Sequence, residues 1–145
     1  MNALGTDILS QISMEEILTP VAITTESTKT SEVFSTDTFR SGAVFIGVEE
    51  AVGNTETFKI EDITVETSDT EAGTNGWTTY TRTRNDGDIT FDGVTSGSVQ
   101  SSAFGINFDG SKGFMRVKIT GTSSDGTATV YLVLIKGGSD TLPIQ

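Results

Sequence analysis

The sequence predicts an all-β fold, a β-sandwich or a jelly-roll-like barrel, with a short N-terminal helix or arm. Short runs of apolar or alternating residues recur roughly every ten residues, with turn-forming residues between them. Threonine recurs along these runs, and the chain has 16 glycines but only 2 prolines. Threonine suits pleated strands and glycine supplies tight turns, so the composition favours many short strands over long helices.

The last third of the chain carries the strongest strand signal. Residues 114–120 alternate between apolar and polar, which indicates a strand with one buried face. A turn at 121–126 and a second strand at about 127–136 follow, so we expect a hairpin. Residues 130–135 are apolar on both faces, as in a strand that is covered on both sides. One cover is the domain core; the other is an arm, a loop or another subunit.

Residues 1–20 form the segment in which a helix is expected. Thr6 or Asp7 caps its start, and Pro20 ends it. We expect a short helix packed across one end of the domain, or an arm that reaches a neighbouring subunit, with residues 21–145 as a single β-sandwich domain. The apolar stripe of this segment consists of Ile8, Leu9, Ile12 and Ile17.

The middle of the chain predicts further strands. The apolar run at 42–48 is short and flanked by glycine, which fits a buried strand better than a helix. The alternation across 57–66 changes phase half-way, so we predict a β-bulge at Glu61-Asp62. A polar loop at 68–76 precedes a strand that begins at Trp77 and is expected to be mostly exposed.

Charge and composition exclude several classes of function. Twenty acidic residues against nine basic ones give a formal charge of -11, which disfavours binding to nucleic acid or to an anionic membrane surface. The chain has no cysteine and no histidine, which removes Ser-His-Asp and Cys-His catalysis and the usual zinc ligands. It also shows neither an apolar run of the roughly 20 residues that a membrane helix needs nor an ordinary signal peptide. We expect no cofactor.

Clustered acids raise two further possibilities. Asp86, Asp88 and Asp92 offer oxygen ligands for calcium, but their spacing differs from an EF-hand loop and Asp-Gly is a common turn signal, so we predict turns and no metal site. Pairs of carboxylates suggest a glycosidase, but acids scattered on strands and loops are usually solvated, so we expect no enzyme and no catalytic residue. These scattered acids are Glu49, Glu50, Glu61, Asp62, Glu66 and Asp69.

Two groups of side chains are candidates for binding. Trp77, Tyr80 and Tyr131 would form a sugar-stacking platform if they lay together, although aromatic residues are more often packing residues. Arg82 and Arg84 share one strand face, where they pair with nearby carboxylates or meet an acidic partner surface. The predicted interface residues are Ile8, Ile12, Ile17, Arg82, Arg84, Tyr131 and Val133.

Residues 33–143 resemble small structural proteins of tailed bacteriophages. The resemblance is carried by a Gly-x-x-Gly-Phe lead into MRVKIT, by YLVLIKGG with a proline shortly after it, and by FRSGAVFIGV and TFKIEDITVETSD in the middle. It implies a β-sandwich and a place among proteins that include capsid decoration (cement) proteins and components of the head and tail.

The function that this resemblance implies is capsid decoration. Such a protein would bind the major capsid protein on the outside of the virion, would stabilise neighbouring capsid subunits, and would form a homo-oligomer, expected to be a trimer. Its acidic surface would suit a position that faces solvent. A head-tail or tail-tube component and a carbohydrate-binding module remain as alternatives.

Overall fold

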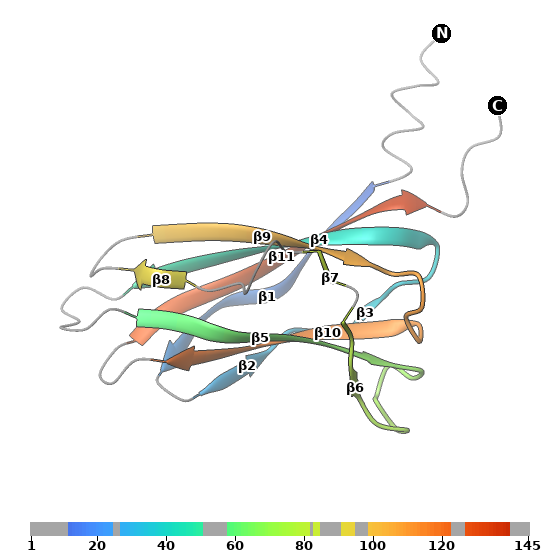
Figure 1. The fold of residues 1–145 in the computed structure, drawn as a ribbon, viewed down its shortest axis with the longest axis horizontal. Helices are drawn as coiled ribbons and strands as arrows, with labels where there is room; N and C mark the ends of the chain where they lie inside the picture. Colours follow the sequence, from blue (N-terminus) through green and yellow to red (C-terminus); the bar gives the residue numbers. More distant parts are fainter. Residues whose placement is uncertain are drawn as a thin grey trace, which may run out of the picture.

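The computed structural model describes residues 12–24, 27–50, 58–81, 83–84, 91–94, 99–122 and 127–139, and in these it shows two antiparallel sheets that face each other (Figure 1). Sheet A has the strand order β1 (Ile12–Thr24), β11 (Thr127–Ser139), β4 (Phe39–Glu50), β9 (Val99–Asn107) and β7 (Thr83–Arg84). Sheet B has the order β2 (Thr28–Thr30), β10 (Phe114–Thr122), β5 (Phe58–Ser68) and β6 (Thr78–Thr79). In addition, β3 (Phe34–Ser35) pairs with β10, and β8 (Phe91–Val94) pairs with β5.

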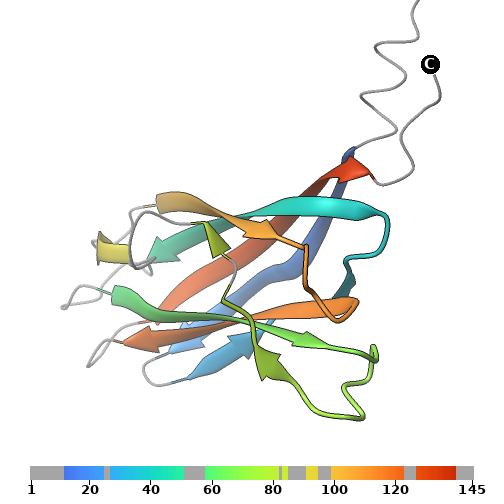
Figure 2. The ribbon, with the colours of Figure 1, turned by 45° about the vertical axis from the view of Figure 1, so that its right-hand side comes forward.

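The long strands alternate between the two sheets along the chain. β4 lies in sheet A, β5 in sheet B, β9 in sheet A, β10 in sheet B and β11 in sheet A, as both ribbon views show (Figures 1 and 2). Two antiparallel sheets connected in this way form a jelly roll. The predicted all-β sandwich is confirmed, and the jelly roll is the form that it takes.

The core fills the space between the sheets. Alternate residues of each long strand point inward, and the inward side chains at the centre of β10 and β11 have no exposed surface. Burying each such side chain contributes about 1.5–3 kcal/mol, so these two strands contribute strongly to the stability of the fold. The fully buried side chains on them are Met115, Val117, Ile119, Val130, Leu132 and Leu134.

The predicted C-terminal hairpin is wrong. β10 pairs with β2, β3 and β5 in sheet B, whereas β11 pairs with β1 and β4 in sheet A. A strand, a polar turn and a second strand make the same local pattern whether the chain turns back in one sheet or crosses to the other. Partners from distant parts of the chain decide between the two.

The predicted N-terminal helix is wrong over residues 12–20, which form the first part of β1. β1 pairs with β11 from Ile12↔Gly137 to Thr24↔Thr127, and this backbone pairing overrides the approximate helical spacing. The boundary drawn at residue 20 therefore falls inside a strand. Pro20 itself sits in a register shift between Leu18 and Val21, a position at an edge strand where a missing N–H is tolerated. Residues 1–11 lie outside the described residues.

The predicted bulge in β5 is confirmed. Thr120 of β10 pairs with Asp62 while Gly121 pairs with Ile60, which leaves Glu61 as the extra residue.

The expectation of an exposed strand after Trp77 is wrong for Tyr80, whose side chain is 8% exposed. Its hydroxyl lies 2.5 Å from the carbonyl oxygen of Asn107 and 3.1 Å from that of Asp109, and so anchors the β9–β10 loop.

A buried cation connects the two sheets at one end of the sandwich. The side chain of Lys136 is 9% exposed; its Nζ lies 3.4 Å from Glu15 Oε1 and donates a hydrogen bond of 3.1 Å to the carbonyl oxygen of Ser35. The same ammonium lies 5.1 Å from the centroid of the Phe39 ring. These contacts compensate for much of the hydration that Lys136 loses on burial.

Candidate interaction surfaces

The outer face of sheet A is apolar across neighbouring strands. The register places Met14, Ile135 and Ala43 in one row, and the next row continues with Glu16, Val133 and Phe45. Because side chains alternate along a strand, these residues point away from the core that Leu134 and Val44 enter. We call this surface the sheet A face; its described residues are Ile12, Met14, Glu16, Ala43, Phe45, Gly47, Glu49, Ser101, Ala103, Gly105, Tyr131, Val133 and Ile135.

Several large apolar side chains on the sheet A face are exposed. Met14 is 68% exposed, Ile12 49% and Phe45 43%. A single exposed apolar side chain is ordinary, but these lie on two strands that flank β11, whose outward residues Val133 and Ile135 are apolar as well. A contiguous apolar surface of this kind is typical of a protein–protein interaction site.

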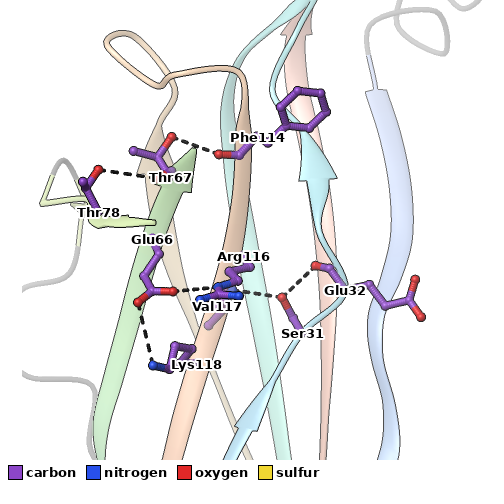
Figure 3. Close-up of polar contacts among 9 residues, drawn as sticks. All are labelled: Ser31, Glu32, Glu66, Thr67, Thr78, Phe114, Arg116, Val117 and Lys118. Carbon is purple, nitrogen blue, oxygen red and sulfur yellow. Dashed lines mark hydrogen bonds and ion pairs between the residues drawn. The ribbon is translucent and has the colours of Figure 1, made fainter. Parts of the chain in front are cut away.

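The outer face of sheet B is polar. Arg116 Nε lies 2.6 Å from Glu66 Oε2, and Lys118 Nζ lies 3.7 Å from Glu66 Oε1 (Figure 3). The guanidinium of Arg116 also lies 4.2 Å from the centroid of the Trp77 ring, which rests on Gly73. The charges of this face therefore pair with one another, and the stacked tryptophan holds the β5–β6 loop against the sheet.

Side-chain hydrogen bonds reinforce the edges of sheet B. Ser31 Oγ accepts a 2.9 Å bond from the backbone N–H of Val117 and donates a 2.8 Å bond to the carbonyl oxygen of Glu32 (Figure 3). Thr67 Oγ1 donates to the carbonyl oxygen of Phe114 at 2.9 Å. These bonds attach the segment after β2 and the end of β5 to the central strand β10.

A polar pocket of about 630 Å³ lies at one end of the sandwich, between residues 36–40 and 107–113. Thr36 Oγ1 and Ser111 Oγ, 2.6 Å apart, connect its two walls. Thr38 has a positive φ of 70°, which is uncommon for a β-branched residue. The pocket carries both signs of charge, from acidic and basic side chains of the two loops. These are Asp37, Arg40, Asp109 and Lys112.

The structure brings together part of the predicted interface. Ile12, Tyr131 and Val133 lie on the sheet A face, whereas Ile17 is 2% exposed and belongs to the core. Ile8 and Arg82 lie outside the described residues, and Arg84 is described only through its backbone pairing with Gly105.

Sequence reasoning missed Met14, Phe45 and Ile135 on the sheet A face. The alternation of Ile12 and Met14 with polar residues is the available signal, but the helical stripe predicted for this segment includes Ile12 and Ile17 and leaves out Met14. Phe45 stands in a run that is apolar on both faces, so the sequence alone does not show which of its residues point outward.

The predicted aromatic platform does not form. Tyr80 is buried, Trp77 packs under Arg116 beside sheet B, and Tyr131 lies on the sheet A face over Gly47. The three rings therefore point to separate regions of the molecule and cannot stack on one sugar chain.

The predicted acid clusters fall partly outside the described residues, since Asp86 and Asp88 lie there and Asp92 is described only as part of the backbone of β8. Among the residues that the structure does describe, no three metal-ligating side chains come together. In the same part of the chain, no helix is long and apolar enough to cross a membrane.

No model of a protein family matches the chain. No curated protein sequence matches it either.

Solved structures do match. The VP2 subviral particle of infectious bursal disease virus aligns with a TM-score of 0.55 and 10% identity over 92% of this chain and 34% of that one. The structure of the Gx strain of the same virus aligns with a TM-score of 0.55 and 11% identity over 90% of this chain and 32% of that one. What is shared is the fold. The chain spans about a third of the length of these viral proteins.

Proposed function

We propose that the chain is a structural protein of a viral particle. Two independent observations support this proposal: its jelly roll is similar to those in structures of a virus particle, and its sequence resembles structural proteins of tailed bacteriophages. The likeness to the viral structures concerns the fold, so the residues on the surface must carry the argument about function.

The observation that carries the proposal is the sheet A face. A chain with a formal charge of -11 is well suited to remain soluble, yet Met14, Ile12 and Phe45 expose apolar surface on the two strands that flank β11. Covering exposed apolar side chains with a protein partner lowers the free energy, because it removes them from water. A structural subunit of a particle has such partners on a large part of its surface.

Within the particle we propose the role of a capsid decoration (cement) protein. It would sit on the exterior, contact the major capsid protein and stabilise neighbouring capsid subunits as a homo-oligomer. The large excess of acidic residues supports a position that faces solvent, because packaged DNA would repel it. The role is one of binding, with no catalytic step assigned to any residue.

The experiment purifies particles of the virus or prophage whose genome encodes the chain and measures its copy number by quantitative mass spectrometry. A decoration protein should be present in numbers comparable to those of the major capsid protein, and protease added to intact particles should cleave it. Particles without the chain should lose their DNA at a lower temperature. Absence of the chain from the particles would contradict the proposal, and a copy number far below that of the capsid protein would indicate the neck or tail.

A further inference from the structure

We propose that the sheet A face packs against the same face of a second copy of this chain. The inference rests on the proposed function, because it names the partner that covers the sheet A face in the assembled state. It commits to face-to-face contact between copies, so that the two A sheets stack as the inner faces of a sandwich do. This contact gives a twofold pair in place of the trimer that the family resemblance implies.

Charge is the first argument for a second copy. Among the residues of the sheet A face whose side chains the structure describes, Glu16 and Glu49 are charged: Glu16 ends the row of Val133 and Phe45 at β1, and Glu49 pairs with Thr129 near the end of β4. Backbone pairing with Gly105 places Arg84 at the opposite edge of the sheet, on β7. Protein partners that differ in charge recognise each other through complementary potentials, but the centre of this face offers no charge to match. Its partner must therefore present an apolar, uncharged surface, and the chain itself carries one.

The second argument is the shape of the face, which has large side chains on one side and small ones on the other. On one side the large residues of β1, β11 and β4 form a ridge, and on the other side the small residues of β4 and β9 form a shallow band. Packing two copies about a twofold axis places the ridge of each against the band of the other, which is the self-complementary arrangement of an isologous interface. The ridge consists of Met14, Ile135, Val133 and Phe45, and the band consists of Ala43, Gly47, Ser101, Ala103 and Gly105.

The side chain of Tyr131 lies flat against the middle of the sheet A face. Its ring lies over Gly47, at a position where a Cβ would come within 2.3 Å of the hydroxyl oxygen. The tyrosine therefore lies along the sheet and does not stand up from it, which leaves room for an opposing ridge.

The test measures the solution mass of the purified chain by light scattering over a range of concentrations. We expect a mass that approaches two chains at high concentration and falls towards one chain on dilution. Phe45→Glu should raise the concentration needed for association at least tenfold, because it places a carboxylate at the centre of the contact. Thr30→Glu is the matched control, since it adds the same charge at an exposed position on the outer face of sheet B. It should leave the mass unchanged.

The dependence of association on salt distinguishes contact between two acidic copies from contact with a basic partner. Two copies that each carry a formal charge of -11 repel each other, so sodium chloride should strengthen their association. Association that weakens as salt is added would overturn the inference. A chain that stays monomeric at all concentrations would overturn it as well, as would an equal effect of Phe45→Glu and Thr30→Glu.

A cysteine probe keeps the inference testable if Phe45→Glu does not fold. The chain has no cysteine, so Ala103→Cys and Thr30→Cys each introduce a single thiol. A maleimide should modify Cys at position 103 more slowly at high protein concentration than after dilution, while position 30 should react at the same rate. Equal rates at position 103 would contradict the contact.

A monomeric chain that is found on particles would overturn this inference alone, and an associating chain that is absent from particles would overturn the proposed function alone.

Discussion

Tyr131 of β11 covers Gly47 of β4, its direct cross-strand partner in sheet A. A Cβ built at Gly47 would stand 1.9 Å from Cζ of the tyrosine, so the ring occupies the space that any other residue would need. Aromatic side chains commonly cover strand glycines in this way and restore the packing that glycine lacks. The pair shapes the sheet A face, and its two members depend on each other.

The first prediction concerns this pair. Gly47→Ala should lower the free energy of unfolding by about 1–2 kcal/mol, because the new methyl group displaces the ring of Tyr131. In a Tyr131→Ala background the same change should be neutral or stabilising by about 0.5–1 kcal/mol, since alanine loses less entropy than glycine on folding. Urea unfolding of the two single variants and the double variant measures this coupling. Additive effects would show that the ring does not oppose a side chain at position 47.

The second prediction concerns Arg116, which pairs with Glu66 and stacks on Trp77. Arg116→Ala should cost about 1 kcal/mol, because it removes a partly exposed ion pair and a cation–π contact. Trp77 is the single tryptophan of the chain, so its fluorescence emission should shift when the guanidinium leaves the ring. Lys118→Ala is the control, since Lys118 lies 3.7 Å from Glu66 and is more exposed. An unchanged emission in Arg116→Ala would contradict the stacking.

The third prediction concerns the pocket wall at Thr38. Thr38→Gly should raise the free energy of unfolding by up to about 1 kcal/mol, because glycine adopts a positive φ without the strain that a β-branched residue carries. Thr36→Gly, two residues earlier, should instead destabilise, because Thr36 is buried and its hydroxyl bonds to Ser111. Thermal unfolding of both variants checks this opposite response. Equal destabilisation would argue against strain at Thr38.

The fourth prediction concerns the N-terminal segment. Deleting residues 1–11 removes no residue of any described strand, so we expect a cooperative melt at a similar temperature. Deleting residues 1–18 removes the first half of β1 together with Ile17, which is 2% exposed, and should abolish cooperative unfolding. Calorimetry of the two truncations measures the difference. A cooperative melt of the longer truncation would show that β11 does not need β1.

Sequence reasoning predicted the strands that local patterns specify. The bulge at Glu61 followed from a change of phase in β5, because a strand can keep one apolar face only if an extra residue intervenes. The two-sided apolar character of residues 130–135 predicted a strand that is covered on both faces, and the core covers one of these faces as predicted. The outward face that this pattern left open is the one on which Val133 and Tyr131 lie.

The sequence by itself determined where the chain is extended and which segments must be buried, because alternation and turn residues act over a few neighbouring positions. Tertiary structure decided which strands are partners. It placed β10 and β11 in opposite sheets and drew residues 12–20 into β1, where Met14 joins Phe45 on one surface through pairing with a strand more than a hundred residues away. Such pairing depends on backbone hydrogen bonds and on burial between distant segments, and no local pattern encodes either of them.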